Sequence, residues 1–208
     1  MLKKYLPIIM FIGAILAFTC LAILVHYHSV LSLDVTLSRY IQGEGNFGIL
    51  NRVSYFGKPV VALIMVFITG VIFWVFNYYR ETIFVLLTLV ASGIHSVVKR
   101  IVDRPRPDDS LINVLSHEHS QSFPSGHVNF FVVFFGFVIV AMLMKPKISR
   151  PIRVLVVLIS LFMIVSVSFS RIYLGTHWAS DVLGGYLLGY SLLSILLYFY
   201  LKPNLNSK

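Results

Sequence analysis

The chain has 208 residues, of which 58% are hydrophobic and 12% are charged, and its mean hydropathy of +0.87 excludes an ordinary soluble domain. Its formal net charge of +9 is dispersed among the loops between apolar segments, which excludes a basic helix face for nucleic acid and favours anionic lipid as partner. The single cysteine, Cys20, excludes an intramolecular disulfide.

Six apolar runs approach the roughly 20 residues that a membrane-spanning helix needs. They cover residues 5–25, 59–77, 82–98, 127–144, 152–169 and 181–201. The first run is longer than the apolar part of a signal peptide and has no small-x-small cleavage site after it, so we expect a permanent anchor. The runs predict an all-α fold, a bundle of six transmembrane helices that forms one domain over residues 1–208.

Residues 31–58, in the first outer loop, alternate apolar with polar side chains at roughly helical spacing. The pattern breaks at Gly43-Glu44-Gly45 and then resumes. Two short interfacial helices fit this pattern, and a solvated loop fits it equally well.

Three polar clusters stand at the ends of apolar runs. Residues 99–107 read Lys-Arg-Ile-Val-Asp-Arg-Pro-Arg-Pro, residues 122–127 read Ser-Phe-Pro-Ser-Gly-His, and residues 170–181 read Ser-Arg-Ile-Tyr-Leu-Gly-Thr-His-Trp-Ala-Ser-Asp. The first two clusters share a loop, and two predicted spans separate this loop from the third cluster. All three are therefore expected on the same face of the membrane.

These clusters contain groups of the kind that bind an oxyanion. Lys99, Arg106 and Arg171 would neutralise its oxygens, with the arginine forks each suited to two oxygens and the lysine acting as a point charge. Ser125 and Gly126 immediately precede an apolar run, so their backbone N–H groups are expected to point out of a helix N-terminus, where anions bind.

His177 and Asp181 are four residues apart, a spacing that places them on one face of a helix within hydrogen-bonding reach. The carboxylate would hold one ring nitrogen as N–H and leave the other free for attack. Spacing alone does not decide which histidine attacks, but the neighbouring acid favours His177 over His127.

The order Lys-x6-Arg-Pro, Pro-Ser-Gly-His and Ser-Arg-x5-His-x3-Asp resembles the type 2 phosphatidic acid phosphatase superfamily, whose site is shared with vanadium haloperoxidases. The resemblance implies that His177 forms a phosphohistidine intermediate and that His127 protonates the leaving group and then activates water. It also implies that the oxyanion is a phosphate, bound by Lys99, Arg106, Ser125, Gly126 and Arg171. It also implies a membrane lipid phosphate as substrate, namely undecaprenyl diphosphate, phosphatidylglycerophosphate or phosphatidic acid.

The remaining polar residues are given structural interpretations. With three cations around the phosphate and no carboxylate cluster, no metal or other cofactor is expected. Arg100 and Arg104 are interpreted as interfacial anchors, and Trp178 as part of an aromatic belt at headgroup level. Gly185-x3-Gly189 is expected to let a neighbouring helix approach closely.

The other histidines are kept out of the site. His95, four residues before Lys99, is interpreted as a packing residue, with support of Lys99 from the same helix face as the alternative. His117-Glu118-His119 is a weak metal motif and is interpreted as a solvated part of its loop.

Two other functions remain open at this point. A lipid phosphotransferase would use the same histidine intermediate, and a non-catalytic module would bind or flip anionic lipid in the same cationic pocket. Haloperoxidase activity is disfavoured because those relatives are soluble.

The distribution of Lys and Arg between alternate loops predicts the orientation. One side carries nine of these residues and the other eight, or five once Lys99, Arg106 and Arg171 are assigned to the site. This bias predicts cytoplasmic termini and an outward-facing site, in a bacterial plasma membrane.

Overall fold

The computed structural model describes residues 2–43 and 48–202, and all regular structure in these two stretches is α-helical. The predicted all-α class is therefore confirmed. The helices are α1 (Leu2–Tyr27), α2 (Ser32–Gly43), α3 (Gly48–Tyr55), α4 (Pro59–Val75), α5 (Tyr79–Gly93), α6 (His95–Val102), α7 (Gly126–Leu143), α8 (Arg150–Tyr173) and α9 (Ala179–Leu201).

Each of the six apolar runs falls on a helix or a helix pair. Five stretches are long and apolar enough to cross a membrane: Tyr5–Tyr27, Tyr79–Val102, Gly126–Leu143, Arg150–Tyr173 and Ala179–Leu201. The remaining run forms α4, which is apolar but has 17 residues. The protein is thus an integral membrane protein, and its third run is divided between α5 and α6 at Ile94.

The periodic segment at residues 31–58 forms two short helices rather than a loop. α2 and α3 lie on either side of the break at Gly43-Glu44-Gly45, of which residues 44 and 45 fall outside the described part of the chain. Asp34 and Ser38 are buried on α2, which packs against α8 and α9. α2 is therefore attached to the helices that carry the third cluster.

α7 lies at the centre of the bundle and contacts α5, α8 and α9. Because lipid is as apolar as its side chains, close packing rather than removal of apolar surface from water holds it there. Gly185 and Gly189 of α9 allow this packing, since an added Cβ at either position would lie 2.9 Å from the Cβ of Val128 or Val132. The predicted packing role of this glycine pair is confirmed.

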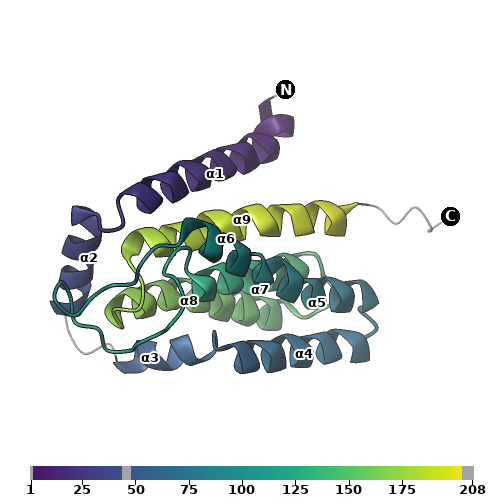
Figure 1. Ribbon diagram of the computed structural model, residues 1–208. Helices are drawn as coiled ribbons and strands as arrows, with labels where there is room; N and C mark the ends of the chain where they lie inside the picture. Colours follow the sequence, from purple (N-terminus) through teal and green to yellow (C-terminus); the bar gives the residue numbers. More distant parts are fainter. Residues whose placement is uncertain (1, 44–47, 203–208) are drawn as a thin grey trace.

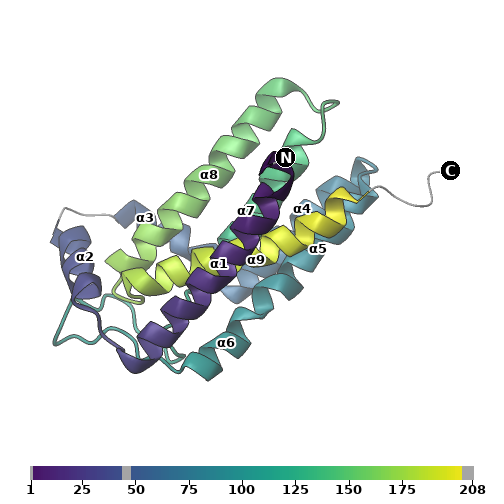
Figure 2. The ribbon, with the colours of Figure 1, turned by 90° about the horizontal axis from the view of Figure 1, so that it is seen from above.

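The polar segments gather at one end of the bundle. Figure 1 shows α2, α3 and the long connection between α6 and α7 at the end where α1 finishes and α9 begins. The start of α1 and the end of α9 lie at the opposite end (Figure 1), and α1 crosses over α9 (Figure 2).

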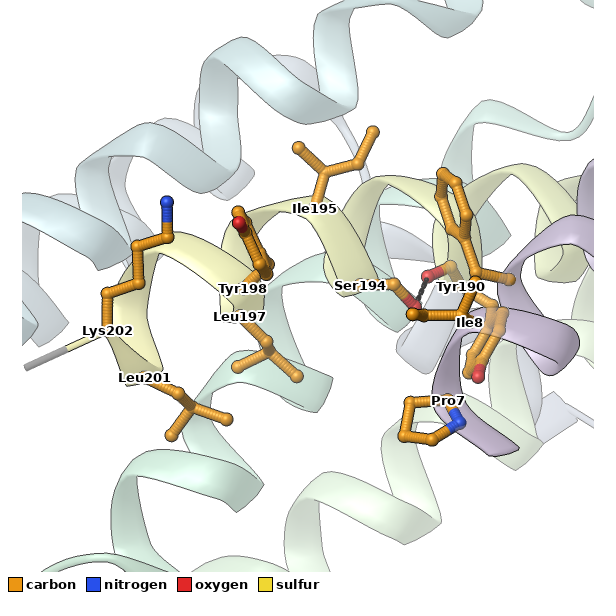
Figure 3. A pocket seen from close by; sticks show the side chains of 10 residues that line it. Pro7, Ile8, Tyr190, Ser194, Ile195, Leu197, Tyr198, Leu201 and Lys202 are labelled. Atoms are coloured by element: carbon orange, nitrogen blue, oxygen red, sulfur yellow. Dashed lines mark hydrogen bonds between the residues drawn. The ribbon is translucent and has the colours of Figure 1, made fainter. Parts of the chain in front are cut away.

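An apolar groove of about 750 Å³ lies between the first turns of α1 and the last turns of α9. Pro7 and Ile8 form one side, Tyr190 and Tyr198 the other, and Lys202 stands at its edge (Figure 3). It is at the other end of α9 from Asp181, so it is separate from the three polar clusters.

Candidate active site

The three clusters meet at the polar end of the bundle. Arg106 donates to the backbone carbonyl of Thr176 and places its Nη1 3.4 Å from Nε2 of His177, which joins the first cluster to the third. The Ser122 hydroxyl donates to the Asp181 carboxylate, which joins the second cluster to the third. Lys99 donates to the backbone carbonyl of Gln121, beside the second cluster.

Two of the expected phosphate-binding residues, Arg106 and Arg171, share one carboxylate. Nη2 of Arg106 lies 3.0 Å from Oε2 of Glu118, and Nη2 of Arg171 donates to Oε1. Arg171 is also held by the Ser54 hydroxyl, 2.7 Å from its Nη1. The pair thus forms a site that binds one oxyanion with both guanidinium groups, and Glu118 fills it here.

Glu118 is ionised in this position. Burial alone would raise the pKa of its carboxyl group, but the positive charges of Arg171 and Arg106 outweigh burial and lower the pKa to about 2. The interpretation of residues 117–119 as a solvated stretch is correct for the exposed side chains of His117 and His119 and wrong for Glu118.

His177 is 1% exposed and lies in the turn between α8 and α9. Its Nδ1 is 3.5 Å from Oδ2 of Asp181, so the expected pair is adjacent, at a distance longer than a well-formed hydrogen bond. Burial lowers the pKa of His177 well below its usual value, and the charges of Arg106, Arg171 and Lys99 lower it further against the opposing effect of Glu118. The imidazole is therefore neutral at pH 7, as a nucleophile must be.

Asp181 is fully buried and heavily bonded. Oδ2 accepts hydrogen bonds from the Trp178 backbone N–H at 2.8 Å and from Ser122, while Oδ1 accepts from Arg104 at 2.5 Å. Trp178 itself is 0% exposed, so its interpretation as a headgroup-level aromatic is wrong.

His127 occupies the first turn of α7. Its ring packs directly on Gly57, where an added Cβ would collide with it. Its charged neighbours are Arg171, Glu118 and Arg106, the same groups that surround His177. Both histidines thus border the site of the two arginines.

Ser125 and Gly126 begin α7 as expected, but the backbone N–H of Ser125 does not point to an open anion site. It donates to the Asp181 carbonyl at 3.0 Å. The Ser125 hydroxyl is buried without a hydrogen-bond partner among the described residues. At Gly126 the close neighbour is His95, whose Nε2 would lie 2.6 Å from an added Cβ, so His95 is a packing residue that supports this turn.

Arg104 and Asp34, like Glu118, are members of the site region that the sequence did not reveal. Arg104 is 1% exposed and forms ion pairs with both Asp34 and Asp181, so its interpretation as an interfacial anchor is wrong. The chain has only eight acidic residues against 17 Lys and Arg, and Asp34 is the one acid before Glu44. Such scarcity was a sequence indication that this carboxylate has a buried cation as partner.

The described residues contain no group of three or more His, Cys, Asp or Glu side chains placed to hold a metal ion. The side chains that the three clusters bring together are two histidines, a carboxylate and a cluster of cations.

Comparison with known proteins agrees with this chemistry. The model of the PAP2 superfamily matches residues 80–205. Phosphatidylglycerophosphatase B of Bacillus subtilis (strain 168) is 33% identical over 208 residues, covering 95% of this chain and 94% of that protein. Decaprenylphosphoryl-5-phosphoribose phosphatase of Mycobacterium tuberculosis (strain H37Rv) is 29% identical, covering 73% of this chain and 79% of that protein.

A solved structure has the same fold. The transmembrane PAP2-type phosphatidylglycerolphosphate phosphatase from Bacillus subtilis superposes with a TM-score of 0.75 at 28% identity, covering 94% of this chain and 96% of that one. This chain belongs to the PAP2 superfamily. It is an integral membrane lipid phosphatase, a phosphoric ester hydrolase of phospholipid metabolism.

Proposed function

We propose that this protein removes the terminal phosphate of phosphatidylglycerophosphate through a phosphohistidine intermediate on His177. The substrate is supported by the names of the 33% identical relative and of the superposed structure. Undecaprenyl diphosphate and phosphatidic acid, which present the same terminal phosphate, are the competing substrates that a direct comparison separates.

The observation that carries the proposal is the position of His177 Nε2. It lies 3.4 Å from Arg106, and Arg106 and Arg171 together bind one carboxylate. A substrate phosphate that replaces the Glu118 carboxylate between these arginines would therefore lie beside the one ring nitrogen of His177 that does not face Asp181.

Each step follows from groups in this site. Nε2 of His177 attacks phosphorus, and a P–N bond forms while the P–O bond to the lipid breaks. Protonated His127 gives its proton to the leaving oxygen, so the lipid departs as an alcohol. His127 then takes a proton from water, whose oxygen attacks phosphorus, and cleavage of the P–N bond releases inorganic phosphate. Lys99, Arg106 and Arg171 stabilise the charge on the phosphoryl oxygens throughout, with the Ser125 hydroxyl and the start of α7 at Gly126 as further contacts.

The proposal includes an arrangement in the membrane. Seventeen residues of helix extend about 26 Å, close to the thickness of a bilayer's hydrocarbon core, so we assign α4 as the sixth span. An even number of spans keeps both ends of the chain on one face. The excess of Lys and Arg on that side supports cytoplasmic termini and an outward-facing site.

The test is phosphate release by the purified protein in detergent with a chelator present, over the three candidate lipids. We expect the highest kcat/KM for phosphatidylglycerophosphate and an acid-labile phosphoryl group on the wild type that is missing from His177→Ala. Retention of activity by His177→Ala would refute the mechanism. A higher kcat/KM for undecaprenyl diphosphate would make that lipid the substrate in place of phosphatidylglycerophosphate. Transfer of phosphate to a second lipid instead of water would identify a phosphotransferase.

A further inference from the structure

Arg104 is buried at the start of α9, and each of its nitrogens has a partner. Nε donates to the Ser29 carbonyl at 2.9 Å, and Nη1 donates to the Ser180 hydroxyl at 2.7 Å and to Oδ1 of Asp181 at 2.5 Å. Nη2 donates to Oδ2 of Asp34 at 2.7 Å. The guanidinium group is thus bound on all sides by protein and is not available to a substrate.

Asp34, on α2, caps the same helix end. Its Oδ1 accepts the backbone N–H of Ser180 at 2.8 Å, and its Oδ2 accepts the Ser180 hydroxyl at 2.7 Å. A carboxylate at these first N–H groups of α9 is stabilised by the helix dipole. Asp34 therefore fixes the turn that carries Asp181, and it does so from a helix far away in the sequence.

The two carboxylates and the guanidinium form one buried charged group. Asp34 is 2% exposed, Arg104 1% and Asp181 0%, so bulk solvent does not screen their charges. Without Arg104, two negative charges would be buried together at a large cost in free energy. With it, one negative charge remains in the group.

The two oxygens of Asp181 have different partners. Arg104 holds Oδ1, whereas Oδ2, which accepts from Ser122 and the Trp178 backbone N–H, is the oxygen 3.5 Å from Nδ1 of His177. The bond from Arg104 to Oδ1 adds to those two and fixes the rotation of the carboxylate from its other side, and with it the position of the oxygen that the histidine faces.

We propose that Arg104 and Asp34 are positioning residues for the His177–Asp181 pair: they orient the Asp181 carboxylate and set the net negative charge that acts on the imidazole. This inference rests on the proposed function, in which His177 becomes positively charged as it attacks phosphorus. A correctly placed carboxylate stabilises that charge in the transition state more than in the ground state.

The sign of the electrostatic effect follows from the groups around each partner. His177 faces Asp181 and the charged groups Arg106, Arg171, Lys99 and Glu118. Replacing Arg104 by glutamine removes one positive charge from the far side of Asp181, so the pKa of His177 rises. Replacing Asp34 by asparagine removes one negative charge, so that pKa does not rise.

The experiment compares Arg104→Gln, Arg104→Lys and Asp34→Asn in the full-length protein in detergent, measuring kcat, KM and the pH dependence of kcat/KM. For Arg104→Gln we expect a loss of about 10²-fold in kcat, with KM within about twofold, because a misplaced orienting group costs rate rather than binding. The acid limb of kcat/KM should rise by about one pH unit in Arg104→Gln and not in Asp34→Asn. Arg104→Lys, which keeps the charge, should recover part of kcat without moving the limb.

Arg100→Gln is the matched control, since Arg100 is an exposed arginine on α6, and its kinetics should equal those of the wild type. A folded Arg104→Gln with unchanged kcat, or with reduced kcat and no rise in the limb, would overturn the inference. If Arg104→Gln does not fold, an unchanged kcat in both Arg104→Lys and Asp34→Asn would overturn the inference instead. Loss of activity in His177→Ala alongside unaffected Arg104 variants would reject the positioning role alone, whereas an active His177→Ala would reject the proposed function.

Discussion

At the scale of single residues, the site holds a carboxylate of its own where the substrate's phosphate is proposed to bind. Glu118 reaches both Arg106 and Arg171, and its low pKa keeps it charged at every pH at which the enzyme would be assayed. A substrate phosphate must therefore displace an existing partner from the two arginines. Part of its binding energy is used for this exchange.

Glu118→Gln should bind substrate more tightly than the wild type. The substitution removes a competing negative charge, so we expect KM for the lipid and the inhibition constant of inorganic phosphate to fall about three- to tenfold. Because the pKa is about 2, the difference should be constant from pH 5 to pH 8. Asp108→Asn, in the same connection but exposed, is the control; equal constants in both variants would show that Glu118 does not compete with phosphate.

The state of His177 determines a pH dependence. Burial lowers the pKa of His177 most, and the charges of Arg106, Arg171 and Lys99 lower it further. In the free enzyme the imidazole therefore stays neutral at pH values well below its usual pKa of 6.5. The acid limb of kcat/KM, which reports the free enzyme, should therefore lie well below pH 6.5. A limb at or above pH 6.5 in the wild type would contradict this.

The residues that the sequence predicted are those that chemistry requires at fixed spacing, such as His177 with Asp181 and Lys99 with Arg106. The three clusters do converge, as the contact of Arg106 with His177 and that of Ser122 with Asp181 demonstrate. Asp34, Arg104 and Glu118 were not identified from the sequence because each has an ion-pair partner more than 50 residues away, which no local spacing encodes.

At the scale of helices, apolar length was sufficient to locate all the long elements, but it did not reveal their interruptions. The third run continues through Ile94 without a charge, yet α5 ends at Gly93 and α6 starts at His95. The packing of α7 on α9 was readable, since glycines four residues apart on an apolar helix indicate close approach.

Gly185→Ala tests this packing. The new Cβ would lie 2.8 Å from the Ser125 carbonyl and 2.9 Å from Val128, neither of which can move freely, so α9 must shift away from α7. We expect a loss of about 1–3 kcal/mol in stability, seen as a lower melting temperature in detergent, with reduced kcat because the same shift moves Asp181. Gly13→Ala, in open space on α1, should change neither; equal melting temperatures for the two variants would mean that the helices do not meet this closely.

At the scale of the whole molecule, the proposed orientation has a direct test with single cysteines in a Cys20→Ser background. His119→Cys and Leu33→Cys should react with a membrane-impermeant maleimide in intact cells, because both exposed side chains are assigned to the outer face. Asn77→Cys and Lys147→Cys, also exposed, should react only after permeabilisation. The opposite pattern would show that the protein has the reverse orientation. Labelling of Leu33→Cys and Asn77→Cys from the same side would mean that α4 does not cross the membrane.

The family match begins at residue 80, but two of the side chains that hold the site lie before it. Ser54 bonds Arg171, and Asp34 bonds Arg104, so two buried arginines of the matched segment depend on acceptors contributed by the first third of the chain. The working unit is thus larger than the segment that sequence kinship marks out. Joining that segment to the N-terminal helices of a distant relative would therefore exchange the buried acceptors of both arginines as well as the membrane anchor.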